Sequence, residues 1–197
     1  MVFGALPMVD HRPVERADAA RNRAKIIAAA SQVLAERGAV ALSVDEVAGR
    51  AGVGVGTIYR RFGDRSGLLW ALLDDRERTF QAAFVSGPPP LGPGSSACER
   101  LRAFLYALLS HVQEHLELMI SAQARAHRQH SGPYGAYRTH VMMLLEQLAP
   151  EADIPVLADM LLAPLEASHV DRQLRDYGYD QARIRCGIDR LLTVVGG

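Results

Sequence analysis

The residues whose types and spacing could do chemistry lie in the first third of the chain. Thr57, Tyr59 and Arg60 place two hydroxyls and a guanidinium close together, and Ser43 and Arg65 lie on either side of them. Hydroxyl and guanidinium groups suit the phosphate oxygens of nucleic acids, and arginine can also contact the edge of a guanine. Whether these groups act together depends on the elements that position them.

Helical periodicity predicts the elements that must position these groups. Apolar residues recur at three- and four-residue steps, and turn residues separate the periodic stretches. Ser43 can cap a helix with Glu46 reaching back to it, and Gly52 can turn the chain at the end of that helix. The predicted helices comprise about 20 residues from Asp18, then 44–51, 55–62, and a fourth helix that Asp64 caps and that runs past Arg76.

Three residues in this stretch have the spacing of a helix-turn-helix. Ala48, Gly52 and Ile58 stand where the motif needs a small residue, a turn and an apolar anchor. The motif would present the N-terminal part of its second helix to the major groove of DNA, through Val55, Gly56, Thr57, Tyr59 and Arg60. The alternative is three short helices in a bundle, with their arginines solvated.

The sequence around this motif resembles the DNA-binding region of the TetR family of bacterial regulators. The resemblance covers about residues 18 to 75 and includes the string AGVGVGTIYRRFGDRSGLL, in which the pattern G-x-x-T-[IL]-Y-x-x-F falls on Gly54, Thr57, Ile58, Tyr59 and Phe62. It implies a homodimer with a three-helix DNA-binding head, and a helical body that pairs through its last two helices and encloses an effector pocket. Gly67 departs from the family pattern and places a poor helix former in the first turn of the fourth helix, at a cost of about 1 kcal/mol relative to alanine.

The rest of the chain is also predicted to be helical, which gives an all-α fold. The proline- and glycine-rich segment 86–96 cannot continue a helix and is expected to be a loop. Pro164 should kink the helix that contains it, and Asp180 should cap the last helix. The further helices are expected at 97–112, 114–129, 135–149, 155–177 and 180–194. The expected domains are a flexible arm over 1–17, a helix-turn-helix domain over 18–64, and an effector-binding and dimerisation domain over 65–197.

The C-terminal body offers weaker signals for a ligand site. Apolar and polar residues at helical spacings could line a cavity, although plain packing is the alternative for each of them. The candidate pocket residues are Phe104, Leu108, His111, Met119, Gln123, His127, Tyr137 and Met142. We expect them to hold a small-molecule effector.

The last two predicted helices carry apolar stripes suited to a four-helix bundle between two chains. The candidate interface residues are Leu157, Leu161, Leu165, Ile184, Ile188 and Leu191. The alternative is that these stripes only cover the core of one protomer.

Charge and composition limit the remaining classes of function. The net charge is zero, but residues 1–65 carry ten basic and seven acidic side chains, whereas residues 66–197 carry twelve and fifteen. The histidine pairs 111/115 and 127/130 have the spacing of zinc ligands on a helix. No cysteine or carboxylate partner completes a set of zinc ligands, so neither a metal nor a cofactor is expected. No catalytic motif, membrane-spanning segment or targeting segment is recognisable, which predicts a cytoplasmic protein that is not an enzyme.

The sequence as a whole predicts a repressor. Two recognition helices spaced by one turn of DNA, about 34 to 36 Å, would bind a palindromic operator in double-stranded DNA. A small-molecule effector would lower the affinity for that operator. In the alternative, the body is a protein-interaction or activation module without an effector. A helical enzyme or binding protein without DNA contact is a third hypothesis.

Overall fold

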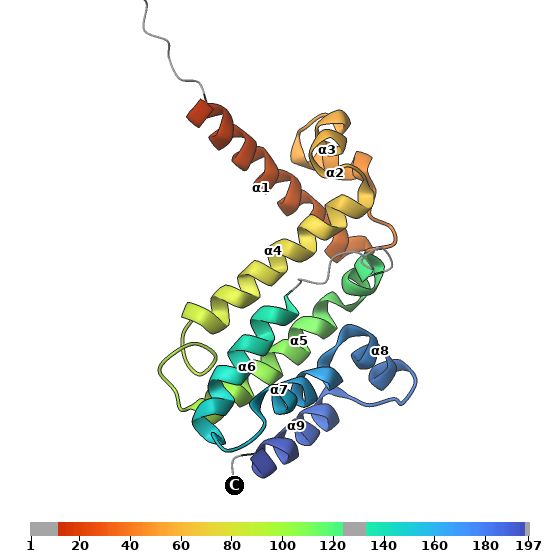
Figure 1. Cartoon of the computed structure of the whole chain (residues 1–197). Coiled ribbons are helices and arrows are strands. Elements are labelled where there is room, and N and C mark those ends of the chain that lie inside the picture. Colours follow the sequence, from red (N-terminus) through yellow and green to blue (C-terminus); the bar gives the residue numbers. More distant parts are fainter. Residues whose placement is uncertain (1–11, 124–132, 196–197) are drawn as a thin grey trace, which may run out of the picture. The chain divides into compact units, whose positions relative to one another are not determined.

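The computed structural model describes residues 12–123 and 133–195, and its regular elements are all helices, which confirms the all-α fold (Figure 1). The chain divides into two compact units, one ending at Leu72 and the other beginning at Leu73. None of the helices within the described ranges is long and apolar enough to cross a membrane.

The first unit contains α1 (Arg12–Arg37), α2 (Val44–Ala51), α3 (Val55–Phe62) and the first turns of α4 (Arg65–Ser86). The bounds of α2 and α3 confirm the sequence prediction. α1 begins six residues earlier than predicted, so part of the expected arm is helical. Pro13 does not prevent this start, because the first N–H groups of a helix have no partner within the helix. The core of the unit comprises Ile26, Ala30, Val33, Val47, Ala48, Ile58, Leu68, Leu69 and Leu72, all buried.

The boundary between the units lies within α4, eight residues beyond the boundary expected from sequence. Leu68, Leu69 and Leu72 are buried and belong to the first unit, because the opening turns of α4 complete the core around α1, α2 and α3. Asp64 caps α4 as predicted, with its Oδ1 accepting a hydrogen bond from the backbone N–H of Gly67 at 2.8 Å. The continuous helix α4 therefore contributes residues to both units.

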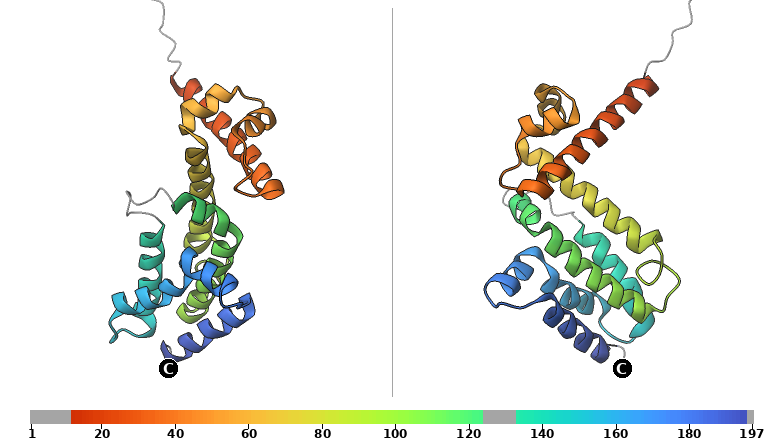
Figure 2. Two further views of the ribbon diagram at one scale, coloured as in Figure 1. Left: turned by 90° about the vertical axis from the view of Figure 1, so that its right-hand side faces the viewer. Right: turned by 180° about the vertical axis from the view of Figure 1, so that it is seen from behind.

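The second unit continues from α4 through a set of packed helices. Figures 1 and 2 show α5 and α6 side by side; α7 packs on α6, while α8 and α9 contact α5. The elements are α5 (Ala97–Gln123), α6 (Tyr134–Leu148), α7 (Ile154–Leu162), the 3₁₀ turn η1 (Ala163–Leu165), α8 (Ala167–Arg175) and α9 (Gln181–Val195). Asp180 caps α9 as predicted, accepting from the backbone N–H of Arg183 at 2.7 Å.

Two predicted helix boundaries in this unit were wrong. The break expected near residue 113 is absent, because nothing there interrupts helical hydrogen bonding, and α5 is continuous to Gln123. The helix expected over 155–177 is divided rather than kinked. Pro164 lies in η1, and Glu166 adopts an extended conformation (φ −64°, ψ 143°) that separates α7 from α8.

The predicted capping box at Ser43 does not form. Ser43 occupies the N-cap position of α2 without a side-chain capping bond, and Glu46 instead accepts a 2.7 Å hydrogen bond from Arg50. A charge-assisted bond to a guanidinium is stronger than a bond to a backbone N–H. A capping box does form at the start of α5, where Ser96 and Glu99 exchange hydrogen bonds of 2.8–3.3 Å.

Candidate DNA-contacting surface and ligand cavities

The side chain of Ile58 anchors α3 on the first unit. It is 1% exposed, and Gly52 makes the turn before α3 in the left-handed conformation (φ 65°) that glycine tolerates best. Gly56, Tyr59 and Arg60 are exposed, at spacings of three and four residues that place them on one face of the helix. This face is available to a macromolecule, as the helix-turn-helix prediction requires.

Val55 and Thr57, the other predicted contacts on α3, are half-buried. Ser43 is half-buried as well and lies outside α3, at the start of α2. The predicted DNA contacts therefore all lie in the first unit. The most exposed of them are Gly56, Tyr59 and Arg60, which share one face of α3.

Arg65, a predicted phosphate contact, forms hydrogen bonds within the first unit. Its guanidinium donates to the backbone carbonyl oxygens of Leu42 at 2.8 Å and Val40 at 2.9 Å, and to that of Ala39. These bonds occupy Nε and Nη2 and tie the start of α4 to the turn between α1 and α2. Arg65 therefore stabilises the packing of the helices in this unit, and its contact with phosphate stays a prediction.

An ion-pair cluster joins α1 to α2. Arg50 contacts Glu36 at 2.6 Å and Glu46 at 2.7 Å, and Arg37 lies 3.3 Å from Glu46. The hydrogen bond from Arg50 lowers the pKa of Glu36, and the two carboxylates raise the pKa of Arg50. The charge of Arg50 is thus neutralised within the unit.

Arg60 and Arg61 on α3 form no ion pair with any residue in the described ranges, and both are exposed. Arg61 was not among the predicted DNA contacts. Its position next to Arg60 on the same short helix was the available signal. The positive charge on α3 that no described carboxylate pairs with therefore comes from two adjacent arginines.

In the second unit, two predicted pocket residues meet at a buried carboxyl group, and a third packs beside one of them. Glu77 of α4 contacts His111 Nε2 at 2.9 Å and accepts a hydrogen bond from the Tyr137 hydroxyl. Burial and the neighbouring Glu77 carboxylate raise the pKa of Tyr137, which keeps its hydroxyl protonated as the donor. Phe80 stacks on the His111 ring at 4.6 Å, and Phe104 lies within 5.9 Å of the Tyr137 ring. These groups fill the interior between α4, α5 and α6.

The remaining predicted pocket residues are dispersed. Leu108 and Met119 are buried, and Met142 is half-buried with its sulfur 3.3 Å from Arg138 Nη1. The Gln123 side chain and His127 lie outside the described residues. Two cavities are described in the second unit, and none of the eight predicted residues lines either of them. Phe104, Leu108, His111, Met119 and Tyr137 are buried in the core of the described part of the unit, and their contact with a ligand stays a prediction.

One cavity of about 600 Å³ lies between α4, the 87–96 loop, α5 and α6; we call it the α4–α6 cavity. It is lined by Gln81, Phe84, Val85, Pro93, Arg100, Gly135, Ala136, Thr139, His140 and Met143. Two of its polar atoms, Arg100 Nε and His140 Nε2, are buried and have no hydrogen-bond partner. Burial, together with the nearby charge of Arg100, lowers the pKa of His140 to about 4, so its ring is neutral at pH 7.

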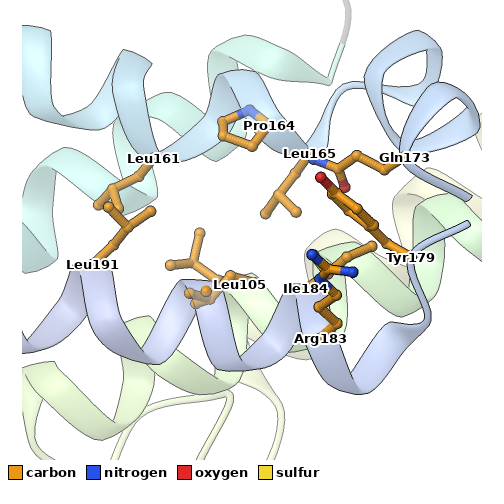
Figure 3. Close-up of a pocket in the computed structure, with 11 residues that line it drawn as sticks. Leu105, Leu161, Pro164, Leu165, Gln173, Tyr179, Arg183, Ile184 and Leu191 are labelled. Carbon is orange, nitrogen blue, oxygen red and sulfur yellow. The ribbon is translucent and has the colours of Figure 1, made fainter. Parts of the chain in front are cut away.

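A second cavity of about 410 Å³, the α7–α9 cavity, lies between α5, α7, η1, α8 and α9. Figure 3 shows leucines, among them Leu161 and Leu191, at one end and Gln173, Tyr179 and Arg183 together at the other. The guanidinium of Arg183 lies 4.2 Å from the centre of the Tyr179 ring. This cavity is apolar at one end and polar at the other.

The predicted dimer residues are mostly part of the protomer's own core. Leu161, Leu165, Ile184 and Ile188 are buried in the single chain, Leu157 is half-buried, and Leu191 is 48% exposed. Apolar periodicity marks the face of a helix that avoids water, and it does not distinguish a protomer's own core from an interface. The exposed apolar side chains on these helices are Val156 and Met160 on α7, and Leu191 and Val194 on α9.

The histidine pairs do not form a metal site among the described residues. His111 and His115 lie with ring centres 4.9 Å apart, but no group of three or more potential ligands is found in the described ranges. The pair at 127 and 130 lies outside those ranges.

Part of the first unit matches known protein sequences. Residues 26–72 match the family model described as bacterial regulatory proteins, tetR family. The chain is 35% identical over 69 residues to an HTH-type transcriptional regulator of Staphylococcus aureus (strain bovine RF122 / ET3-1), which covers 35% of this chain and 37% of that protein. The aligned region thus spans little more than a third of the curated relative.

Solved structures resemble the fold over nearly the whole chain. A TetR-family transcriptional regulator from Streptomyces coelicolor is 19% identical, with a TM-score of 0.64, and the match covers 90% of this chain and 97% of that one. The regulator FadR from Bacillus subtilis, solved in complex with stearoyl-CoA, is 20% identical, with a TM-score of 0.59 and coverage of 88% and 97%. At these identities the likeness shows the fold.

Proposed function

We propose that this chain, of which residues 26–72 match the tetR family of bacterial regulatory proteins, is a DNA-binding transcriptional repressor that binds a palindromic operator as a homodimer and leaves it when a small molecule occupies the second unit. The observation that carries the proposal is the exposed face of α3. Gly56, Tyr59 and Arg60 share that face, while Ile58 fixes the opposite face in the core.

The chemistry of this face suits a DNA groove. Arg60 and Arg61 carry charges that no described carboxylate neutralises, and Tyr59 is 49% exposed with a hydroxyl that can contact phosphate. Gly56 adds no side-chain bulk, which allows the helix backbone to approach the base edges. Arg65 and the Arg50 ion pairs link the helices that support α3.

The effector site of the proposal is the α4–α6 cavity. Gln81, Phe84 and Val85 of α4 line it, and α4 also carries the residues that complete the core of the DNA-binding unit. A ligand that shifts the last turns of α4 acts on a helix shared by both units, and couplings of this kind are typically 1–3 kcal/mol. The stearoyl-CoA complex of the FadR neighbour is consistent with a ligand-responsive regulator of this fold.

The exposed apolar side chains on α7 and α9 supply the proposed homodimer surface. Val156 and Met160 are four residues apart, and Leu191 and Val194 three apart, so each pair lies on one helical face. A two-fold axis would place these faces against their counterparts on a second chain, as a self-complementary interface requires.

The test is selection of binding sites from random double-stranded DNA, followed by titration of the selected sequence at several salt concentrations. We expect a palindromic site, and an Arg60→Ala variant that binds it about 10- to 100-fold more weakly because a base or phosphate contact is lost. Arg78→Ala is the matched control, since Arg78 is also an exposed arginine, is 68% exposed on α4, and should retain full affinity.

Two results would contradict the proposal. The first is the failure of the selection to enrich any sequence, and the second is equal operator affinity of Arg60→Ala and the unmodified protein. Operator complexes that persist across a broad compound library would instead favour a body that acts by protein interaction.

A further inference from the structure

The α4–α6 cavity contains two buried polar atoms that the protein leaves without partners. Arg100 lies in the first turn of α5, and His140 lies in the middle of α6 and is 6% exposed. Arg100 Nε and His140 Nε2 both have no hydrogen-bond partner, and both residues line the same cavity. In native proteins nearly all buried polar atoms form hydrogen bonds. Two buried nitrogens without a hydrogen-bond partner at one cavity therefore point to a bound ligand that provides the partner.

The side chains of Arg100 and His140 indicate the charge that the polar group of this ligand should carry. Arg100 is a permanent cation and donates only, so it requires an acceptor and attracts an anion. The imidazole of His140 can donate from Nε2 in the appropriate tautomer. Since the pKa of His140 is lowered to about 4, its ring adds no second charge at pH 7, and a single negative charge balances the site.

The walls define the remainder of the ligand. Phe84, Val85, Ala136 and Met143 present apolar surface around the cavity, and no acidic side chain is among the residues that line it. The volume of about 600 Å³ is in the range of small-molecule sites. An acyl chain or an aromatic body fits such walls, whereas a sugar or a polyanion would leave many polar groups unsatisfied.

We propose that the α4–α6 cavity binds a monoanionic ligand with an apolar body, whose carboxylate accepts hydrogen bonds from Arg100 and His140. The role of this ligand as the effector rests on the function proposed above, but its binding does not. Its apolar body contacts Phe84 and Val85 of α4, which links occupancy of the cavity to the helix shared by both units.

The experiment is isothermal titration of the full-length, DNA-free protein at pH 7 with two sets of matched probes. The first set is octanoate, octanol and octylamine, and the second is phenylbutyrate and phenylbutanol. We expect a carboxylate in at least one set to bind, and to bind about tenfold or more tightly than its neutral counterpart, because charge-assisted hydrogen bonds are lost with the alcohol.

Variants assign the preference to Arg100 and His140. Arg100→Gln should reduce the affinity for the carboxylate to that for the alcohol, and His140→Phe should weaken the carboxylate while leaving the alcohol unchanged. Arg102→Gln is the control, because Arg102 lies on the same helix, is 45% exposed and pairs with Asp189 outside the cavity. Far-ultraviolet circular dichroism establishes that each variant is folded before titration.

The outcomes separate this proposal from the function proposed above. Equal binding of acid and alcohol, preference for octylamine, no binding of either carboxylate, or an unaffected Arg100→Gln variant would each overturn it, whether or not the protein binds an operator. Conversely, carboxylate binding that depends on Arg100, in a protein that binds no DNA, would support this site and contradict the repressor.

Discussion

For the substitution Gly67→Ala, helix propensity and tertiary structure predict opposite changes in the free energy of unfolding. Gly67 lies in the first turn of α4, where alanine should stabilise the helix by about 1 kcal/mol relative to glycine. In the structure, a Cβ at this position would lie 2.9 Å from the carbonyl carbon of Phe62 and closer still to its oxygen. Phe62 ends α3, so the tight turn between α3 and α4 leaves no room for a methyl group.

The expected result follows from the balance of these two effects. The atoms that must move are backbone rather than a flexible side-chain end, so the cost is near the upper end of the 1–3 kcal/mol typical of overpacking, about 3 kcal/mol. Subtracting the propensity gain leaves Gly67→Ala destabilised by about 2 kcal/mol. Gly49→Ala is the matched control, because Gly49 lies in α2 of the same unit and a Cβ there would meet nothing within 4 Å.

Urea unfolding followed by circular dichroism measures both variants. We expect Gly49→Ala to raise the free energy of unfolding by up to about 1 kcal/mol and Gly67→Ala to lower it. If α3 reads the operator as proposed, the operator affinity of Gly67→Ala should fall as well, because the displaced backbone belongs to the end of α3. If Gly67→Ala were as stable as the unmodified protein, the close approach of α3 and α4 would not exist and the assigned role of Gly67 would be wrong.

Two further predictions concern the stability contributed by Arg65 and the pH dependence of stability caused by His140. Arg65→Lys should lower the free energy of unfolding by about 1–3 kcal/mol, because lysine cannot reproduce the guanidinium bonds to several carbonyls; unchanged stability with reduced salt dependence of DNA binding would instead indicate a phosphate contact. For His140, the pKa is depressed in the folded state, so the unfolded chain binds more protons between pH 4 and 6.5, and stability should fall by about 3 kcal/mol as the pH decreases through that window. His140→Phe should remove this part of the pH dependence in urea titrations, and a profile identical to that of the unmodified protein would refute the assignment.

Local signals in the sequence determined the short helices of the first unit and the turns beside them. The bounds of α2 and α3, the left-handed turn at Gly52 and the cap at Asp64 all follow from interactions between residues a few positions apart. Such interactions are encoded in the order of the residues, so the periodicity and the turn residues were sufficient to predict them.

The capping boxes show where local reasoning fails. The pattern Ser-x-x-Glu occurs at 43–46 and at 96–99, but only the second forms the box. At the first, Glu46 contacts Arg50 and Arg37, and Arg50 also reaches Glu36 on another helix. The same short pattern has two outcomes because Glu46 has competing arginine partners, Arg50 one turn away on α2 and Arg37 on α1.

Tertiary structure alone decided the role of Arg65, the burial of the predicted dimer residues and the place of the cavities. Arg65 bonds to carbonyls more than 20 residues earlier in the chain, and Arg100 and His140 reach one cavity from different helices. Apolar periodicity shows which face of a helix avoids water, but it contains no information on whether a neighbouring helix, a second chain or a ligand covers that face. That choice depends on contacts between residues distant in sequence, which form only when the helices pack.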